Sequence, residues 1–316
     1  MTAPRFVPLL DRSQIDEAAR QNQSLWAYGR SDADHRAHTA AQLANAGPEL
    51  LRYVGLVGDH GLVAACKRYG LLFRANGREA RVFGIGAVFT PEAERGRGHA
   101  PALIRALHAE ARDLGYAAAI LYSDIDPAYY ARLGFLALPA VDHFASPDAL
   151  PTVGALAFRP AEEADLDRLI AWHEASWAAS PEAIRPMRSR ALWRFFRWRN
   201  RIAGAWILSE GERDVGYLLA GLDDPQRDLP DPRPEGLLWV DEWSAPDVDP
   251  ARVLATIRAL AEREGARTIG LWLRPGQDPA PFRATPRLAS FPMILPIAKG
   301  LSVDPARSHL GSFEHF

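Results

Sequence analysis

The stretch FTPEAERGRGHAPALI, residues 89–104, places two arginines and two glycines in four consecutive positions between an apolar run and a helical pattern. The apolar run, ARVFGIGAVFT at 80–90, is typical of a strand, and Leu103, Ile104 and Leu107 share one face of a helix. At such a strand-to-helix turn the backbone N–H groups converge, and the helix dipole favours negative charge. The stretch therefore predicts a loop that holds an anion, and its arginines favour pyrophosphate.

The other common phosphate loops do not fit this stretch. A P-loop needs a Gly-Lys-Ser or Gly-Lys-Thr ending, which is absent. The dinucleotide-binding pattern needs three glycines near the N-terminus and an acidic residue about 20 positions later. As a bare string, Arg-Gly-x-Gly also occurs in surface turns with solvated arginines. The neighbouring elements must therefore decide between a binding loop and a surface turn.

Length and composition indicate about two globular domains, since 316 residues exceed what one hydrophobic core usually organises. The formal net charge of −2 argues against a general binder of nucleic acid or membrane surfaces. Cys66 is the only cysteine, which excludes an intrachain disulfide and a cysteine-based metal cluster. No apolar stretch approaches the roughly 18 residues of a membrane span. We expect a cytoplasmic protein without a metal, nucleic-acid or membrane partner, and a homo-oligomer stays open.

The order of predicted elements repeats along the chain. The first half shows a strand, two helices and a strand, then a hairpin with an Asn-Gly turn, the loop, a helix and a buried strand; the segments are PRFVPLL, Ser13–Tyr28, Asp32–Ala46, ELLRYVGLVGD, LVAACKRYGLLFRA, ARVFGIGAVFT, the helix closed by Gly115, and AAAILYS. After SPDALPTVG the same order recurs weakly, from ALAFRPAEEADLDRLIAWHEASW to PMILPIAKGL. We expect two related α/β domains divided near residue 150.

Two motifs in this order resemble those of the GNAT superfamily of N-acetyltransferases. GAVFTPEAERGRGHAPALI is similar to its coenzyme-A loop, in which Arg95, Gly98 and Ala100 fill the characteristic positions. YSDIDPAYYARLGF resembles its second signature, a short helix with a tyrosine, here Tyr130, four residues before a Gly-Phe pair. The doubled architecture looks most like fungal lysine N6-acetyltransferases and enhanced-intracellular-survival aminoglycoside acetyltransferases. The resemblance implies an α/β (α+β) fold of two tandem GNAT-like domains, residues 1–150 and 151–316, each a mixed, largely antiparallel sheet flanked by helices.

The resemblance also implies acetyl-CoA as co-substrate and a small-molecule amine as acceptor. Backbone groups of Ala87, Val88 and Phe89 would pair with the pantetheine arm. The pyrophosphate would lie against the loop residues Arg95, Gly96, Arg97, Gly98, His99 and Ala100. The amine would attack the thioester directly, with the oxyanion stabilised by the N–H of Val88 or Phe89. Tyr130 would protonate the departing thiolate, whereas Tyr129 is expected in the core.

The second half lacks the loop. At the matching place it has DEWSAPDVDPARVLATI, without an Arg-Gly run and with aspartates that would repel a pyrophosphate. We expect residues 151–316 to be a degenerate domain that does not bind the cofactor and walls the amine site. Mycothiol synthase, another two-domain member of the superfamily, is disfavoured because its active loop lies in the C-terminal half.

Two further patterns have ordinary structural interpretations. LWRFFRWRNR, residues 192–201, could stack on single-stranded nucleic acid, but its spacing favours an amphipathic core helix with a basic face. WHEASW lacks the second histidine of a metalloprotease helix, so His173 is interpreted as a plain surface or core residue and no metal is assigned.

The general base is missing from the strand at 80–90, which contains no Asp, Glu or His. Asp124 and Asp126 are candidates by position, although they would serve equally as helix caps. In the enhanced-intracellular-survival family the chain's terminal carboxylate reaches the active site, which makes Phe316 a further candidate; alternatively, Phe313 and Phe316 plug the domain interface. The amine would be of the lysine, aminoglycoside or polyamine class. The alternatives are an acyl-CoA sensor without catalysis and a protein lysine acetyltransferase.

Overall fold

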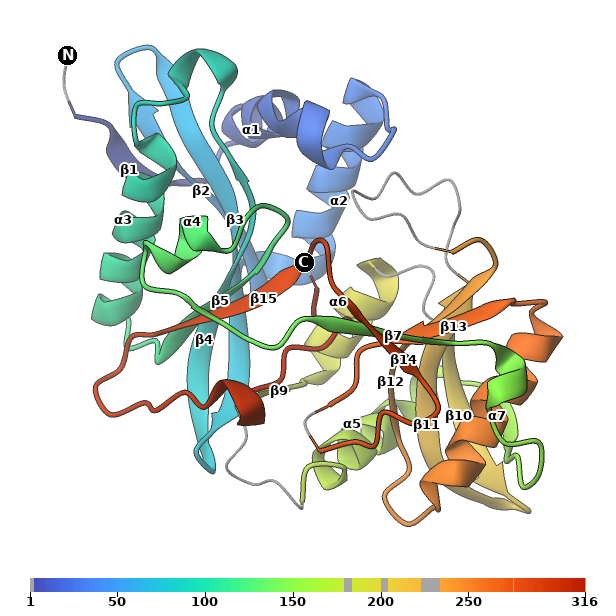
Figure 1. The fold of residues 1–316 in the computed structure, drawn as a ribbon. Helices are drawn as coiled ribbons and strands as arrows, with labels where there is room; N and C mark the ends of the chain where they lie inside the picture. Colours follow the sequence, from blue (N-terminus) through green and yellow to red (C-terminus); the bar gives the residue numbers. More distant parts are fainter. Residues whose placement is uncertain (1–2, 179–183, 200–203, 223–233, 275, 316) are drawn as a thin grey trace. The chain divides into compact units, whose positions relative to one another are not determined.

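The computed structural model describes residues 3–178, 184–199, 204–222, 234–274 and 276–315 (Figure 1). The chain divides into two compact units, and each is built from two separate stretches of sequence. The first unit contains Met1–Pro139 and Ala289–Pro305, and the second contains Ala140–Leu288 and Ala306–His315.

The first unit is a mixed sheet in the order β1-β2-β3-β4-β5-β15-β6, in which β4 and β5 run parallel and the other neighbours antiparallel. Its elements are β1 (Arg5–Leu9), α1 (Arg12–Trp26), α2 (Asp32–Leu50), β2 (Leu51–Gly58), β3 (Gly61–Ala75), β4 (Arg78–Phe89), the 3₁₀ turn η1 (Glu92–Glu94), α3 (His99–Asp113), β5 (Ala118–Ser123), α4 (Ala128–Ala131), β6 (Leu136–Ala137) and β15 (Phe291–Pro296).

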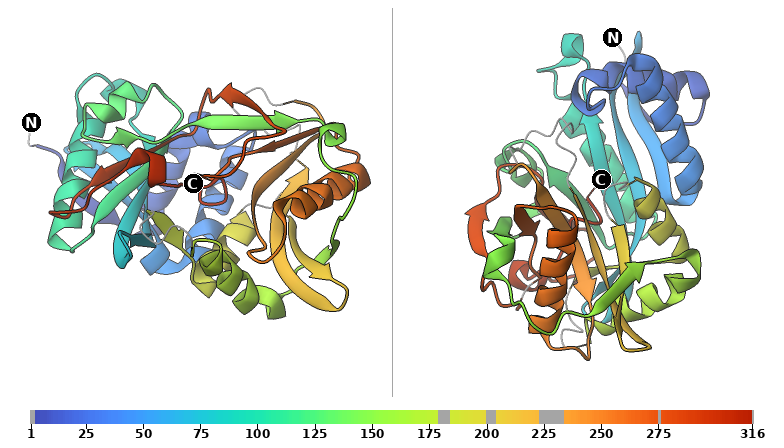
Figure 2. Two further views of the ribbon diagram at one scale, coloured as in Figure 1. Left: turned by 60° about the horizontal axis from the view of Figure 1, so that its bottom comes forward. Right: turned by 90° about the vertical axis from the view of Figure 1, so that its right-hand side faces the viewer.

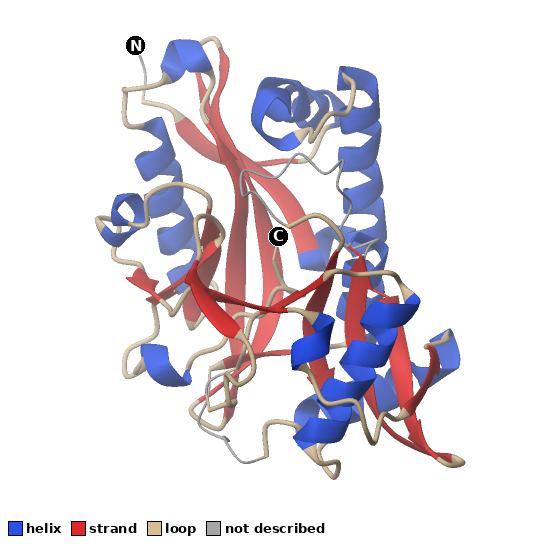
Figure 3. Ribbon diagram, turned by 45° about the vertical axis from the view of Figure 1, so that its right-hand side comes forward, coloured by secondary structure: helices blue, strands red, loops and turns tan. Residues whose placement is uncertain are grey.

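The two faces of this sheet have separate apolar clusters. Cys66 of β3 packs with Leu103, Ile104 and Leu107 of α3, whereas its neighbour Ala65 packs with the cluster beneath α1 and α2. Alternation of side chains along β3 explains the division, since successive residues point to opposite faces. Helix α3 accordingly lies on one side of the sheet and α1 and α2 on the other (Figure 3).

The second unit repeats this plan in a sheet of order β14-β7-β13-β12-β11-β10-β8, with β12 parallel to β13. Figure 2 shows α7 lying against its strands. Its elements are β7 (Val141–Ala145), η2 (Pro147–Ala149), β8 (Ala157–Pro160), η3 (Glu163–Asp165), α5 (Leu166–Ala175), β9 (Arg185–Met187), α6 (Arg190–Arg199), β10 (Gly204–Glu210), β11 (Arg213–Leu222), β12 (Leu237–Ser244), α7 (Pro250–Arg263), β13 (Thr268–Leu271) and β14 (Arg283–Pro286); η4 (Pro305–Arg307) spans the last change of unit.

The two sheets exchange one strand each. In matching order, β8, β10, β11, β12 and β13 repeat β1 to β5. The next strand is β15 in the first sheet and β7 in the second, so each comes from the other half of the sequence. The division therefore differs from the single boundary expected near residue 150. A strand's own sequence sets its burial pattern but not which sheet edge it pairs with, which is why the exchange could not be predicted.

A buried ionic cluster holds the chain end within the second unit. Arg188 is 4% exposed and donates to Glu242, with Nη2 2.8 Å from Oε2, and to Glu314, with Nε 2.5 Å from Oε1. Tyr217 also donates to Glu242, at 2.5 Å. Burial raises the pKa of Glu314 to about 7. Burial also acts to raise the pKa of Glu242, but the charge of Arg188 helps to hold that pKa well below its usual value. The cluster thus contains two carboxylates that share one guanidinium.

Both minor patterns of the sequence have structural roles. Leu192, Trp193, Phe195 and Phe196 are buried on α6, which confirms the amphipathic core helix. His173 is 1% exposed, and its Nε2 atom lies 3.2 Å from the carbonyl oxygen of Pro186. Within the described ranges, no group of three or more His, Cys, Asp or Glu side chains could hold a metal ion. None of the described helices is long and apolar enough to cross a membrane.

Candidate functional site

The parallel pair β4 and β5 stays together only along part of its length. Paired positions run from Val82 with Ala118 to Ile85 with Leu121. Beyond them β5 continues beside β15 as far as Ser123, and β4 continues beside β3 as far as Phe89. The last residues of β4 therefore have an edge without a paired strand among the described residues (Figure 1). Such an edge can accept an extended ligand through backbone hydrogen bonds.

A β-bulge lies in this part of β4. Gly86 pairs with Lys67 and Phe89 with Ala65, so two residues of β4 oppose one of β3. The first of the two, Ala87, has φ 49°, which is unusual for a residue with a side chain. Bulges change the direction of the backbone and are frequent beside active sites. Ala87, Val88 and Phe89 thus lie where the unpaired edge and the bulge coincide.

The loop after β4 brings its six predicted residues to the start of α3. Gly96 has φ 74°, and Gly98, the N-cap of α3, has φ 77°. At neither glycine would an added Cβ meet an atom within 4 Å, so the backbone angle rather than space requires glycine. The N-cap residue of α3 is a glycine and makes no side-chain bond to the first turn, so the N–H groups at this helix start suit an anion. Arg95 is exposed, with Nε donating to the Thr90 carbonyl at 3.3 Å.

Glu94 is a residue of this loop that the sequence analysis did not single out. Its Oε2 lies 3.0 Å from Nη1 of Arg97 and 3.2 Å from Nε2 of His99. A carboxylate therefore occupies two donors that were expected to face a phosphate. Glu94 is three residues before Arg97 and five before His99. These residues lie in a loop, where sequence spacing does not determine which side chains meet, so the contacts could not be predicted.

Tyr130 is buried in α4, 8% exposed, within the cluster that also contains the α3 side chains. Its ring packs edge-on against Tyr129 and Phe135, at centroid distances of 5.0 and 5.9 Å. Burial raises the pKa of the Tyr130 hydroxyl well above its usual value, so the group keeps its proton. Tyr129 is partly buried against the same core, as expected.

The two candidate aspartates after β5 have different environments. Oδ1 of Asp126 accepts from the Ala128 N–H at 2.9 Å, which is the contact of a helix-starting residue. Oδ1 of Asp124 accepts both the N–H and the hydroxyl of Ser290, at 3.0 and 3.1 Å. Phe316 lies outside the described residues. Phe313 is buried in the second unit, where its ring packs on Trp193 at 5.0 Å.

The corresponding place in the second unit is occupied by the chain's own end. Pairing of β12 with β13 stops at Val240 and Leu271, and Asp241 is the extra residue of a bulge in β12. Ser312 donates its hydroxyl to Oδ1 of Asp241 at 2.6 Å and accepts from Trp239 Nε1 at 3.2 Å. An aspartate and a bound chain segment thus lie where the first unit has its bulge and open edge.

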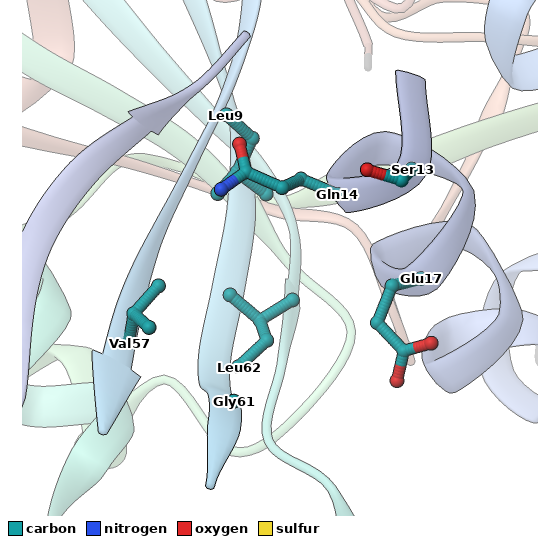
Figure 4. Close-up of a pocket in the computed structure, with 7 residues that line it drawn as sticks. All are labelled: Leu9, Ser13, Gln14, Glu17, Val57, Gly61 and Leu62. Atoms are coloured by element: carbon teal, nitrogen blue, oxygen red, sulfur yellow. The ribbon is translucent and has the colours of Figure 1, made fainter. Parts of the chain in front are cut away.

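One cavity of about 220 Å³ lies elsewhere in the first unit, between α1 and the ends of β1, β2 and β3 (Figure 4). It contains none of the predicted site residues. It is lined by Leu9, Ser13, Gln14, Glu17, Val57, Gly61 and Leu62.

Comparison with known proteins concerns the family and the fold. Residues 9–137 match the family model described as an acetyltransferase (GNAT) domain. No curated protein matches the chain. Three solved structures are similar in fold. A GCN5-related N-acetyltransferase from Kribbella flavida is 19% identical over 92% of this chain and 71% of its own, with a TM-score of 0.67, and Eis1 from Mycobacterium abscessus is 18% identical over 93% of this chain and 74% of its own, with a TM-score of 0.62. A tandem GNAT protein from the clavulanic acid biosynthesis pathway is 14% identical over 94% of this chain and 99% of its own, with a TM-score of 0.54.

Proposed function

We propose that the chain is an acetyl-CoA-dependent N-acetyltransferase acting on a primary amine of a small molecule, because residues 9–137 match the family model of a GNAT acetyltransferase domain. The observation that carries the proposal is the coincidence of three features: the parting of β4 from β5, the bulge at Ala87, and an uncapped helix start behind two positive-φ glycines. Together they suit a ligand with an extended arm and a diphosphate.

Acetyl-CoA binding would use backbone groups more than side chains. The amide groups of Ala87, Val88 and Phe89 would hydrogen-bond the pantetheine arm along the open edge of β4. The N–H groups from Gly96 to Ala100, with Arg95, would hold the pyrophosphate. Arg97 and His99 contact Glu94 in this structure and would bond to phosphate oxygens instead when acetyl-CoA binds. The Glu94 carboxylate would then lose both of these partners.

The reaction would be direct acyl transfer. The neutral amine nitrogen attacks the thioester carbonyl carbon, a C–N bond forms, and the C–S bond breaks. The N–H of Val88 or Phe89 would stabilise the oxyanion, because a bulge turns a peptide away from its partner strand. Tyr130 would give its proton to the departing thiolate, and its raised pKa keeps that proton available at neutral pH.

The second unit would not bind the cofactor. Asp241 would place negative charge where the first unit would bind the pantetheine arm and stabilise the oxyanion, and Ser312 already bonds to it. The expectation that residues 151–316 wall the amine site stays a prediction, as does the lysine, aminoglycoside or polyamine class of the amine.

Thiol release tests the proposal. Purified protein is mixed with acetyl-CoA and a panel of lysine, polyamines and aminoglycosides, and free CoA thiol is followed with a chromogenic disulfide. We expect release that depends on both acetyl-CoA and one amine class. Binding of acetyl-CoA without turnover on any amine would favour a sensor, and turnover only on protein lysines would favour a protein acetyltransferase.

A further inference from the structure

Asp124 lies at the carboxyl end of β5. It follows directly on β5, at the end of that strand where β4 has already parted from it. Tyr130 is near enough that the charge of Asp124 contributes to the raised pKa of the tyrosine. The carboxylate and the proposed acid therefore share one neighbourhood.

Ser290 holds the carboxylate of Asp124 in place. Ser290, the residue before β15, directs its N–H and its hydroxyl to the same oxygen, Oδ1. Ser290 has φ 56°, a backbone angle that persists only where the surrounding structure requires it. Among the described residues no donor bonds to Oδ2. The arrangement orients the side chain and leaves its second oxygen for another group.

The surroundings of Asp124 favour proton exchange. Burial raises the pKa of its carboxyl, and the two hydrogen bonds from Ser290 oppose that rise. The charge of Asp124 acts in turn on Tyr130 of α4. Two other groups are engaged elsewhere: Asp126 accepts the Ala128 N–H at the start of α4, and His108 packs against Phe83 and Phe135.

We infer that Asp124 receives the acceptor amine as an ammonium ion and takes its proton on Oδ2 before the nitrogen attacks the thioester. This assignment rests on the proposed function and deepens it, because it requires an acceptor that arrives as a cation. One proton passes from the ammonium to Asp124 and on to solvent before the attack. Once the C–N bond has formed, the nitrogen loses a second proton to Asp124 or solvent, and Tyr130 gives its proton to the sulfur as the C–S bond breaks. Tyr130 then regains a proton from solvent, so one proton is released in total and the enzyme returns to its starting state.

The test compares Asp124→Asn, Ser290→Gly and the control Asp126→Asn. Asparagine keeps an oxygen that can accept from Ser290 but cannot take a proton, whereas asparagine at 126 can still accept the Ala128 N–H. We expect Asp124→Asn to lower kcat by roughly 10²- to 10⁴-fold with acetyl-CoA affinity unchanged. Asp126→Asn should keep a kcat within about threefold of the wild type, a margin near the usual error of such comparisons.

The pH profile of kcat separates a base from a structural tether. Ser290→Gly keeps the backbone donor and the positive φ but removes the hydroxyl that stabilises the carboxylate. The acid limb of kcat should therefore move to higher pH in Ser290→Gly and disappear in Asp124→Asn. An unchanged limb in Ser290→Gly, or a kcat of Asp124→Asn close to that of the wild type, would overturn the assignment. Wild-type thiol release decides the proposed function first, so the two failures are distinguishable.

Discussion

At the scale of single residues, Tyr130 shows how burial prepares a side chain for chemistry. Its hydroxyl is held in the α3 core, where ionisation is disfavoured, so it remains an acid over the range in which amines react. We expect Tyr130→Phe to lower kcat by roughly 10²- to 10⁴-fold. Acetyl-CoA affinity, measured by calorimetry, should stay the same because phenylalanine keeps the ring contacts with Phe135. A fully active variant would remove Tyr130 from the mechanism.

Gly98 allows the charge of the loop to be tested without changing its backbone. Asparagine and aspartate both tolerate the left-handed conformation that Gly98 adopts, and they differ mainly in charge. Gly98→Asp should abolish measurable acetyl-CoA binding, whereas Gly98→Asn should retain part of it. Equal affinities for the two variants would show that the first turn of α3 holds no phosphate. Arg95→Glu against Arg95→Gln gives a second pair of the same design.

Much of the candidate site could be predicted from sequence because its residues are local. Arg95 to Ala100 follow one another, and strand, loop and helix are adjacent, so spacing determines where their backbone points. Glu94 and Ser290 could not be predicted. The first acts across a loop, and the second is 166 residues from its partner Asp124.

At the scale of elements, the bulge in β4 lies at the end of the strand where the acetyl-CoA arm is proposed to bind. Gly84 and Gly86 lie in the same strand, but the irregularity is at Ala87, which carries the positive φ. Ala87→Gly should leave the free energy of unfolding within about 1 kcal/mol of the wild type. Ala87→Val should lower it by about 1–3 kcal/mol and weaken acetyl-CoA binding, since a β-branched residue resists this angle.

Urea unfolding of both variants at equal protein concentration gives the two free energies. Equal stability of the glycine and valine variants would mean that Ala87 does not keep its left-handed angle in solution.

At the scale of the whole molecule, the exchanged strands tie both halves of the sequence together. A chain cut after residue 150 lacks β15, so β5 and β6 lose the strand that lies between them in the sheet order. We expect residues 1–150 expressed alone to be insoluble or to show no cooperative melting, because β5 then presents an apolar unpaired edge. Co-expression with residues 151–316 should restore soluble protein. A stable, acetyl-CoA-binding fragment 1–150 would contradict the exchange.

The ionic cluster around Arg188 predicts a specific pH dependence of stability. The pKa of Glu314 is raised in the folded state, so its contribution to stability is full below the unfolded pKa and is lost as pH rises through about 7. The melting temperature of Glu314→Gln, relative to that of the wild type at the same pH, should therefore increase from pH 5 to pH 8. A constant difference over this range would show that Glu314 does not change its charge.

The strand exchange has a further consequence during synthesis. Ser290, which precedes β15, is 166 residues beyond Asp124, which follows β5. A ribosome that adds about 5–20 residues per second needs roughly 10–30 s to cover that distance. Throughout this interval the emerging first sheet lacks a strand that no earlier residue supplies. The nascent chain, rather than the finished protein, is therefore the species in which the edge of β5 is open to chaperones and to aggregation with neighbouring nascent chains.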